Sequence, residues 1–468
     1  MINEFNTYSL RSLKYEKSVE QKKKTEKGIF YTTIDLTKTI MNFLSIPSSS
    51  IVLDPCCGTG SFLLSAKSMG VENIFGADID KKAVDVCKET LESENIVRYD
   101  TLSNNANSII KKLKMNEKAD YIVGNPPYVP IGKASIYQKE YLFNREVKDC
   151  GNNLFIAALL RSFDLSKETG IISYIIPKNF LHVASYGILR KRILTDKTIL
   201  SIVDLGACFK DVRGEQILLT IKNSKPTKKT KITLYNIADN QFNKTLDVLQ
   251  SDFENEIILF KNKNDCSIFK TLSTSYETFN DICTGYVGRG RSTSDNAITG
   301  KDIIKFAFKG DIAIPKTGNK VFIQNIYSAE AGIIASFAGN LEASETVTVF
   351  TDGDEKMCRY IVGVLHSRLC NYFLYKFCYN SSKLTMHTDA KYLKKIPLIK
   401  TDETFNQIVN IVKTLETTVY LSKQWFEFVE ALNALVYKAY DISEKDKEHI
   451  EKEMKIIHSQ RWCTSNVS

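Results

Sequence analysis

The segment Ile51-Val-Leu-Asp-Pro-Cys-Cys-Gly-Thr-Gly-Ser-Phe62 decides the fold class of this chain. It predicts a short apolar strand that ends at Asp54, a loop that contains Gly58 and Gly60, and a helix that begins at Ser61. Glycines let a backbone approach a ligand closely, and nucleotide-like ligands bind beyond the carboxyl ends of parallel strands. The spacing matches neither the P-loop nor the dinucleotide-binding fingerprint, so both of those classes are disfavoured.

Around this segment, short apolar runs alternate with amphipathic stretches between residues 28 and 222. This alternation predicts an α/β fold with a mostly parallel sheet and helices on both faces. The predicted strands are 51–53, 73–77, 119–124, 170–176, 201–205 and 216–221, and the predicted helices include 63–69, 81–91 and 154–165.

Composition excludes several classes of protein. The 468 residues suggest two to four domains, and 43% hydrophobic with 25% charged residues is an ordinary globular mixture. The N-terminus lacks a signal-peptide core, and no apolar run approaches the ~18 residues of a membrane span. The 11 cysteines form no C-x-x-C pair, and five scattered histidines disfavour a zinc ribbon. We therefore expect a cytoplasmic protein with reduced thiols. The net charge of +9 is compatible with a polyanionic partner without proving one.

Acidic residues follow several of the predicted strands. Asp78 ends the strand after the one that ends at Asp54, Asp80 lies just beyond it, and Asp100 lies near the end of a further short strand. A carboxylate at the end of the second strand can accept hydrogen bonds from the ribose hydroxyls of an adenosine-type ligand. Each acid alone also fits a solvated strand end, but their common register favours a ligand site.

The tetrapeptide Asn125-Pro-Pro-Tyr128 follows another apolar strand. Two prolines fix the backbone and remove two N–H donors, so the carbonyl groups of the turn stay available as acceptors. Asn125 adds a side-chain acceptor, and Tyr128 adds a flat ring on which a planar base can stack. A purely structural Pro-Pro turn is the alternative. The position downstream of a nucleoside-type loop favours a site that holds and activates an amine.

Residues 28–222 resemble, in motif order, the S-adenosylmethionine-dependent N6-adenine DNA methyltransferases of the TaqI-like and Eco57I-like class. In that class the cofactor motif comes first and the recognition domain last. Gly28–Thr33 resembles the upstream cofactor-edge motif, although Thr33 stands where Pro is usual. Residues 54–62 resemble the first cofactor motif, 76–80 the ribose-binding acid, 100–102 the adenine-edge acid, and 153–155 the segment whose Phe packs on the cofactor adenine.

On the substrate side, Asn125–Tyr128 resembles the catalytic motif of this class. Phe209, in 206–211, stands where the family has an aromatic residue that stacks on the flipped base; an ordinary buried Phe is the alternative. The resemblance implies a Rossmann-like class I methyltransferase domain, S-adenosylmethionine as cofactor, no metal, and direct attack by the exocyclic amine. The implied catalytic residues are Asn125, Pro126, Pro127 and Tyr128, and the implied substrate contacts are Tyr128 and Phe209. The implied cofactor contacts are Tyr31, Thr32, Asp54, Pro55, Cys57, Gly58, Gly60, Asp78, Ile79, Asp100, Thr101, Asn125 and Phe155.

The composition changes after residue 222. Residues 222–231 are polar and predict a loop or linker, while residues 1–27 predict a solvated arm. We expect a catalytic domain over 1–235 and an α+β target-recognition domain over 236–468 that ends in helices at about 402–457. Residues 284–400 hold 16 Lys+Arg against 10 Asp+Glu, so this region is the natural reader of DNA. We expect 285–291 to form a mobile basic loop that meets phosphates or guanine edges. A generic α+β domain with solvated lysines is the alternative.

Other functions share the Asn-Pro-Pro-Tyr chemistry. Protein glutamine-N5 methyltransferases and RNA adenine-N6 or guanine-N2 methyltransferases are the alternatives, and a non-enzymatic DNA-binding protein is a more distant one. The basic C-terminal region favours double-stranded DNA as partner. Only about 27 residues precede the first motif, and no nuclease signature is visible. We therefore expect a site-specific adenine methyltransferase that either has a separately encoded restriction endonuclease or acts alone.

Overall fold

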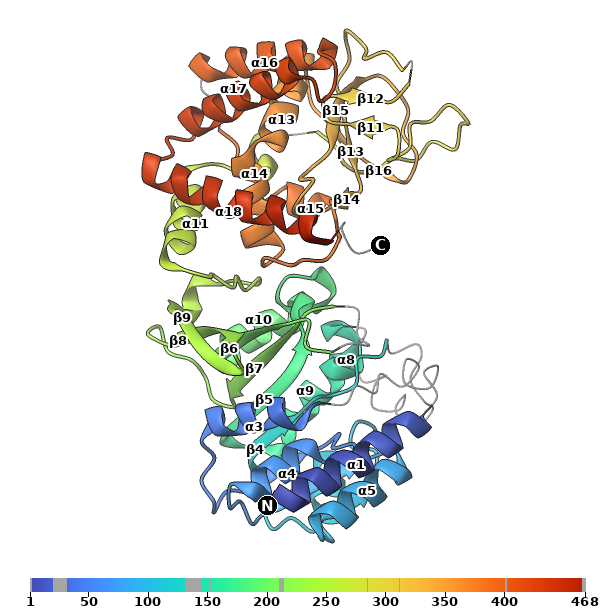
Figure 1. The fold of residues 1–468 in the computed structure, drawn as a ribbon, viewed down its shortest axis with the longest axis vertical. Coiled ribbons are helices and arrows are strands. Elements are labelled where there is room, and N and C mark those ends of the chain that lie inside the picture. Colours follow the sequence, from blue (N-terminus) through green and yellow to red (C-terminus); the bar gives the residue numbers. More distant parts are fainter. Residues whose placement is uncertain are drawn as a thin grey trace. The chain divides into compact units, whose positions relative to one another are not determined.

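The computed structural model describes residues 2–19, 32–130, 145–151, 153–209, 214–283, 285–310, 312–399 and 402–464. The chain divides into an N-terminal unit, Met1–Ile257, and a C-terminal unit, Ile258–Ser468 (Figure 1). The expected domain boundary after residue 235 falls inside a strand of the N-terminal unit, because residues 231–249 extend its sheet. Among the described residues, no helix is both long enough and apolar enough to cross a membrane.

The N-terminal unit is built on one nine-stranded sheet, with the order β3-β2-β1-β4-β5-β7-β6-β8-β9. The neighbouring pairs β3–β2, β2–β1, β1–β4 and β4–β5 are all parallel. Strand β7 lies between β5 and β6 and is antiparallel to both. The mostly parallel α/β sheet predicted from the sequence is therefore confirmed. The strands are β1 (Val52–Asp54), β2 (Ile74–Asp78), β3 (Ile96–Arg98), β4 (Ala119–Gly124), β5 (Ser166–Pro177), β6 (Thr198–Gly206), β7 (Gln216–Lys222), β8 (Lys231–Ala238) and β9 (Gln241–Leu249).

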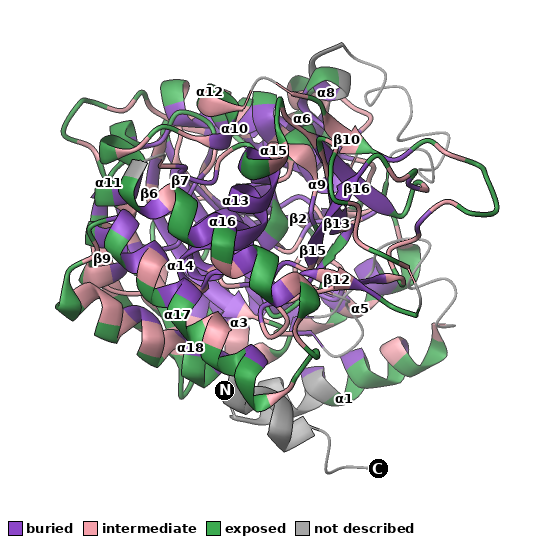
Figure 2. Ribbon diagram, turned by 90° about the horizontal axis from the view of Figure 1, so that it is seen from above, coloured by how far each residue is buried: buried purple, intermediate pink, exposed green. Residues whose placement is uncertain are grey.

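Helices cover this sheet, and the central strands are buried on both faces (Figure 2). Burial on both faces explains why these strands are continuous apolar runs in the sequence. Asp80 caps the helix after β2 by accepting from the N–H groups of Lys82 and Ala83, which fixes the end of the preceding loop. The helices are α1 (Ile2–Ser18), α3 (Ile34–Leu44), α4 (Ser61–Ser68), α5 (Lys81–Leu91), α6 (Ala106–Leu113), α8 (Arg145–Cys150), α9 (Leu154–Leu165) and α10 (Gly187–Asp196).

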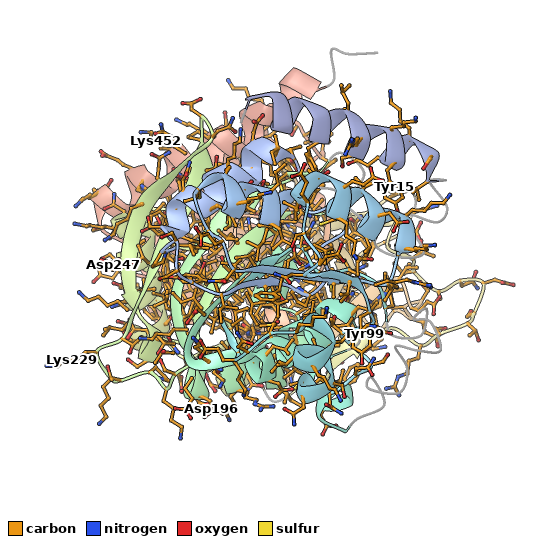
Figure 3. All side chains as sticks on the ribbon, turned by 90° about the horizontal axis from the view of Figure 1, so that it is seen from below. Tyr15, Tyr99, Asp196, Lys229, Asp247 and Lys452 are labelled. Carbon is orange, nitrogen blue, oxygen red and sulfur yellow. The ribbon has the colours of Figure 1, made fainter. Side chains whose placement is uncertain are left out.

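Strand β9 forms one edge of the sheet. Its side chains are mostly exposed, and Lys244 Nζ lies 2.7 Å from the Oδ2 atom of Asp247, which Figure 3 labels. Charged side chains on an edge strand disfavour pairing with a second sheet. Residues 222–231 are thus a short connection between β7 and β8 within one sheet.

The C-terminal unit combines a four-stranded antiparallel sheet, in the order β10-β16-β13-β15, with a group of helices. The predicted helical tail is confirmed by α16, α17 and α18. The strands are β10 (Val287–Arg289), β11 (Ile303–Ile304), β12 (Ala307–Phe308), β13 (Lys320–Gln324), β14 (Ile326–Tyr327), β15 (Ala335–Gly339), β16 (Val347–Thr351) and β17 (Met386–His387). The helices are α11 (Lys263–Ser275), α12 (Phe279–Ile282), α13 (Glu355–His366), α14 (Arg368–Phe373), α15 (Ala390–Leu393), α16 (Asp402–Thr417), α17 (Lys423–Ala439) and α18 (Glu444–Thr464).

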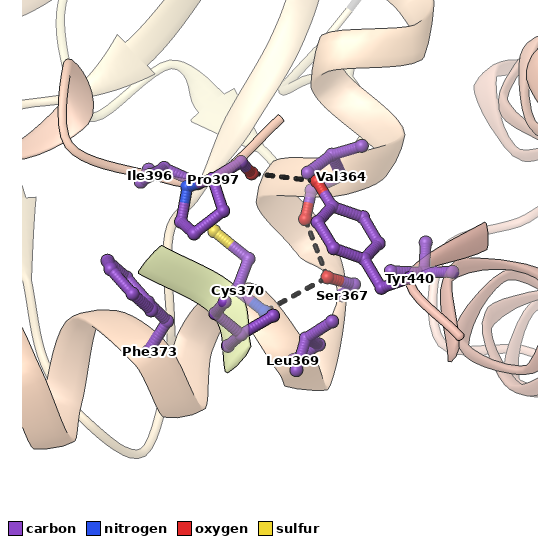
Figure 4. A pocket seen from close by; sticks show the side chains of 10 residues that line it. Val364, Ser367, Leu369, Cys370, Phe373, Ile396, Pro397 and Tyr440 are labelled. Atoms are coloured by element: carbon purple, nitrogen blue, oxygen red, sulfur yellow. Dashed lines mark hydrogen bonds between the residues drawn. The ribbon is translucent and has the colours of Figure 1, made fainter. Parts of the chain in front are cut away.

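Apolar side chains and satisfied polar groups fill the space between these helices (Figure 4). The Ser367 hydroxyl donates to the Val364 carbonyl and accepts from the Cys370 N–H. The Tyr440 hydroxyl donates to the Pro397 carbonyl at 2.7 Å. Because both hydroxyl groups in this space are hydrogen-bonded and most of the other side chains that line it are apolar, this region is core.

A buried carboxylate holds α18 against α11. Oδ1 of Asp265 accepts from the Tyr372 hydroxyl at 2.7 Å and lies 2.7 Å from His449 Nε2, while its Oδ2 lies 3.4 Å from Lys376 Nζ. Burial raises the pKa of Asp265, but Lys376, His449 and Tyr372 outweigh that effect and hold it below its usual value. The carboxylate is therefore ionised and its charge is compensated.

We expect Asp265→Asn to lower the free energy of unfolding of the C-terminal unit by about 2 kcal/mol, because it removes the buried charge that Tyr372 and His449 contact and leaves Lys376 with Glu453 as its counter-ion. Both tryptophans of the sequence lie within the range of this unit, and Trp425 is buried in it, so tryptophan fluorescence during guanidinium unfolding reports on this unit. Since the folded pKa of Asp265 is depressed, its contribution is present above the unfolded pKa and is lost as the pH falls through the folded pKa.

Glu403→Gln serves as the control, because Glu403 pairs with Lys438 on the exposed surface of the same unit. It should leave the unfolding midpoint unchanged. Equal midpoints for wild type and Asp265→Asn would contradict the assigned role.

Candidate functional site

Three neighbouring parallel strands deliver the predicted site residues to one edge of the sheet. Strand β1 ends at Asp54, its neighbour β2 ends at Asp78, and its other neighbour β4 ends immediately before Asn125. A Cβ atom on Gly124 would lie 2.7 Å from Oδ1 of Asp54, so the end of β4 passes directly beside that carboxylate. The structure therefore brings the two sequence motifs together, as their positions after parallel strands predicted.

The loop after β1 is held by hydrogen bonds to both acids. The Gly58 N–H donates to Oδ2 of Asp78 at 2.9 Å, and the Cys56 N–H donates to Oδ1 of Asp54 at 3.1 Å. Oδ1 of Asp78 also accepts from the Asp80 N–H at 2.8 Å. These bonds fix the two carboxylates before any ligand arrives.

Gly58 and Gly60 have φ values of +51° and +93°. A Cβ atom on Gly58 would meet nothing within 4 Å, whereas one on Gly60 would lie 2.4 Å from the Cys87 Sγ atom of α5. Position 60 therefore favours glycine for two reasons: the backbone has a positive φ, and α5 approaches closely. Cys57 and Cys87 are both buried in the same core, which agrees with a packing role.

Asp54 is buried, and burial raises its pKa to about 8, with the nearby Asp78 carboxylate adding to the rise. The hydrogen bond from Cys56 favours the ionised form but does not offset the burial. Asp54 is thus largely protonated at neutral pH. A cation placed beside it would favour ionisation, so this carboxyl group suits a positively charged ligand.

The Asp100 region closes another side of the loop. Oδ1 of Asp100 accepts from the N–H groups of Leu102 and Ser103, and the Thr101 hydroxyl donates to the Pro55 carbonyl at 2.8 Å. Thr101 therefore ties the segment after β3 to the loop after β1. Ile79 is an exposed apolar residue next to Asp78. Its position suits a cover for a flat ring, and the ligand contacts of Ile79 and Asp100 stay predictions.

The amide of Asn125 is oriented by its neighbours. Its Nδ2 donates to the Thr32 hydroxyl at 3.3 Å, and its Oδ1 lies 2.5 Å from the Tyr128 hydroxyl, which also lies 2.9 Å from the Ile175 carbonyl. The side-chain oxygen of an amide is an acceptor with two lone pairs, so Oδ1 of Asn125 is a group of the kind that can hold an amine. Thr32 is buried at this point, and Tyr31 lies outside the described residues.

Tyr128 rests on an aromatic cluster. Phe155 meets the Tyr128 ring edge to face, with centroids 6.2 Å apart, and also contacts Phe180 and Tyr186. Burial raises the pKa of Tyr128, so its hydroxyl stays protonated and donates. Phe155 is itself completely buried within this cluster. Phe155 therefore packs against the Tyr128 ring. The expected contact of Phe155 with a cofactor adenine stays a prediction.

Phe209 lies in the connection between β6 and β7. It is buried, and the neighbouring Cys208 N–H donates to Oε1 of Gln216 at 3.3 Å. Below this connection, Lys178 Nζ lies 2.9 Å from Asp204 Oδ2 and 3.7 Å from Glu215 Oε2, and all three side chains are buried. These contacts anchor both ends of the connection. The stacking role of Phe209 stays a prediction, and residues 210–213 lie outside the described residues.

Helix α1 supplies two side chains that the sequence analysis missed. The hydroxyl groups of Tyr8 and Ser12 each lie 3.0 Å from the Thr59 hydroxyl, at the centre of the loop after β1. Residues 2–18 of the predicted solvated arm thus form a helix that anchors this loop, and residues 20–27 lie outside the described residues. The available signal was the spacing of Tyr8, Ser12 and Tyr15, which places all three on one face of a helix.

Comparison with known proteins identifies relatives of this chain. The model of the N-6 DNA methylase family matches residues 15–281. The type II methyltransferase M.VspI of Vibrio sp. (strain 343) is 29% identical over 207 residues, which cover 42% of this chain and 48% of that protein. The modification methylase CviBIII of Paramecium bursaria Chlorella virus NC1A is 30% identical over 231 residues, with coverages of 47% and 56%. The chain thus spans about half the length of these curated relatives.

A solved structure matches most of the chain. The type IIL restriction-modification enzyme MmeI in complex with DNA aligns with 91% of this chain and 75% of its own, with a TM-score of 0.58 and 11% identity. At that identity the likeness concerns the fold. Together with the strand order, it confirms the expected Rossmann-like class I methyltransferase fold followed by a further α+β unit.

The two glycines of the loop after β1 should differ in their tolerance of alanine. We expect Gly58→Ala to cost about 1 kcal/mol of stability, because only its backbone conformation is strained. Gly60→Ala should cost about 3 kcal/mol, because it adds a clash with Cys87. Urea unfolding followed by far-ultraviolet circular dichroism measures both. A smaller loss for Gly60→Ala than for Gly58→Ala would contradict the packing described here.

Proposed function

The chain belongs to the N-6 DNA methylase family, and we propose that it transfers a methyl group from S-adenosylmethionine to N6 of an adenine in double-stranded DNA. The observation that carries the proposal is the oriented Asn125-Pro-Pro-Tyr128 turn beside the Asp54 and Asp78 loop. The relatives named above are type II and modification methylases. We therefore propose a site-specific adenine methyltransferase of a restriction-modification system, either paired with a separate endonuclease or acting alone.

The residues of the site fit S-adenosylmethionine. The Asp78 carboxylate, at the end of β2, is placed to accept from ribose hydroxyls, as the family resemblance implies. The buried Asp54 suits a ligand with positive charge, and the loop with Gly58 and Gly60 allows close approach of the backbone. When bound, the cofactor supplies an already activated methyl group, and no metal is required for that chemistry.

The chain's own residues hold and activate the amine. We propose that Oδ1 of Asn125 and the Pro126 carbonyl accept hydrogen bonds from the two N6 hydrogens. The two acceptors favour the form of the amine whose lone pair lies on nitrogen, and they stabilise the positive charge that develops on N6. As the bond from N6 to the methyl group forms, the bond from methyl to sulfur breaks, S-adenosylhomocysteine leaves, and N6 loses one proton to solvent. Holding the amine in line with the methyl group supplies much of the remaining rate. The hydrogen bonds to Thr32 and Tyr128 keep the Asn125 amide in the required orientation.

A target adenine must leave the duplex to reach this turn. Extrusion costs a few kcal/mol, and stacking on Tyr128 offsets part of that cost. The rigid aromatic support from Phe155 keeps the Tyr128 ring in place. Phe209 is the proposed second stacking partner.

An RNA adenine or a protein glutamine amide would use the same two acceptors, so both remain alternative substrates of the proposed reaction. The excess of basic residues in 284–400 supports DNA. We further propose that the protein acts on chromosomal DNA in a prokaryotic cytoplasm.

We expect Asn125→Ala to reduce methyl transfer by at least about 100-fold, because it removes one acceptor of the amine. Tyr128→Ala should cause a severe loss, and Tyr128→Phe a milder one. Expression in a host without adenine methylation, followed by modification-sensitive sequencing of genomic DNA, measures the activity. Asn243→Ala, which removes an exposed amide from β9, is the matched control. Turnover of Asn125→Ala at the wild-type level would refute the proposed chemistry.

Cofactor binding should release a proton at pH 7. Asp54 has a pKa of about 8 without ligand, and a cationic ligand lowers it, so Asp54 ionises on binding. Affinity should therefore rise with pH up to about 8 and then level off. Titration calorimetry in buffers of different ionisation enthalpy measures the proton release. S-adenosylhomocysteine, which lacks the sulfonium charge, should release fewer protons, and Asp54→Asn should release none. Equal proton release by Asp54→Asn and wild type would exclude Asp54 as the group that titrates.

A further inference from the structure

In the C-terminal unit, the segment Gly285-Tyr-Val-Gly-Arg-Gly-Arg291 contains the edge strand β10 at its centre, Val287–Arg289. The expected mobile loop is wrong for its centre, since β10 pairs antiparallel with β16 and places Arg289 opposite Thr348. Tyr286 is tied to the same neighbour, because its N–H donates to the Thr351 hydroxyl at 2.8 Å. The bulky side chains of the segment 285–291 therefore extend from a backbone that is held by β16.

Tyr286 folds back over this strand. A Cβ atom on Gly288 would lie 2.2 Å from the Tyr286 hydroxyl oxygen, so the ring occupies space that a side chain at position 288 would need. The Tyr286 hydroxyl donates to the Arg289 carbonyl at 3.3 Å, and the guanidinium of Arg291 lies 5.8 Å from the ring centroid. Tyr286 is 47% exposed. The alternation of glycines with large side chains thus builds an exposed platform of one aromatic ring and two arginines.

Arg289 is the most constrained member of this platform. Its Nη2 lies 3.3 Å from Oδ1 of Asp389, and its Nη1 donates to the Glu345 carbonyl at 3.3 Å. Asp389 is itself placed by its neighbour Thr388, which is buried and whose carbonyl accepts from the Thr348 hydroxyl at 3.0 Å. A guanidinium has five N–H donors, and these two contacts use only two of them. Arg289 is therefore oriented while most of its donors stay available.

The side chains involved remain on the surface. Arg289 is 48% exposed and Asp389 is 42% exposed, and an exposed ion pair of this kind adds little to stability. Strand β17 lies just before Asp389 in the sequence and pairs with β14. In β14, Ile326 has an apolar side chain that is 56% exposed. An oriented arginine, a stacked arginine and an exposed apolar side chain are the groups with which proteins read a DNA groove.

We propose that this platform, together with Asp389, contacts double-stranded DNA and that Arg289 selects a guanine within the recognition sequence. The residues concerned are Tyr286, Arg289, Arg291 and Asp389. The inference rests on the proposed function and adds a residue that determines specificity. Arg289 donates to O6 and N7 of the guanine from an orientation set by Asp389. Arg291 contacts a phosphate and contributes affinity without sequence preference.

The test is a selection of bound duplexes from a randomised pool by the purified full-length protein, followed by sequencing. Wild type should enrich one motif that contains guanine. Arg289→Ala should keep the other positions of the motif and lose about 10- to 100-fold of the preference for guanine at one of them. Arg289→Lys and Asp389→Asn should lose part of it. Arg291→Ala should select the unchanged motif but reduce the salt dependence of binding by about one released ion.

Lys438→Ala is the charge-matched control, since it removes an exposed cation of the same unit that pairs with Glu403. It should leave both the motif and the salt dependence unchanged. An unchanged motif in Arg289→Ala, an equal loss of affinity for every sequence, or the absence of any motif in wild type would each overturn the proposal.

Methyl transfer is measured separately on the same proteins. A wild type that selects a motif without methylating it would refute the proposed function and leave the role of Arg289 standing. Methylation of the wild-type motif by Arg289→Ala would refute the role of Arg289 and leave the proposed function standing. Tryptophan fluorescence of each variant verifies that the C-terminal unit is folded.

Discussion

The hydrogen bond from the Gly58 N–H to the Asp78 carboxylate joins the loop after β1 to the end of β2, and the proposed site is organised around it. It exists because β1 and β2 are parallel neighbours whose carboxyl ends meet at one edge of the sheet. Strand β4 lies on the other side of β1 and brings Asn125 to the same edge. Chemistry that requires a cofactor and an amine in line thus depends on the order of three adjacent strands.

Much of this arrangement follows from local sequence pattern. Helices α5 and α9 begin and end where the apolar spacing predicted them, and each begins after a side chain that accepts from the first turn, Asp80 and Asn153 respectively. The strands β1, β2 and β4 were predicted because burial on both faces leaves continuous apolar runs. The acids and the Asn-Pro-Pro-Tyr turn were found because they directly follow those strands.

The features that escaped prediction depend on partners far away in the sequence. Tyr8 meets Thr59 across 51 residues, and Asp265 meets His449 across 184 residues, so no local pattern announces either contact. The strand character of β10 was hidden for a related reason. Its glycines resemble a flexible loop in the sequence, yet Gly288 accommodates the ring of Tyr286, and the strand is ordered by pairing with β16.

Helix α1 also bears on where the N-terminal unit begins. The family match starts at residue 15, whereas Tyr8 and Ser12 lie before that point and hold the central threonine of the loop after β1. The family match therefore begins inside the folded unit, after two side chains that support the loop. A chimeric enzyme joined at the edge of the family match would inherit the motifs but lose the support behind them. Grafting the N-terminal unit onto a different C-terminal unit requires the helix as well.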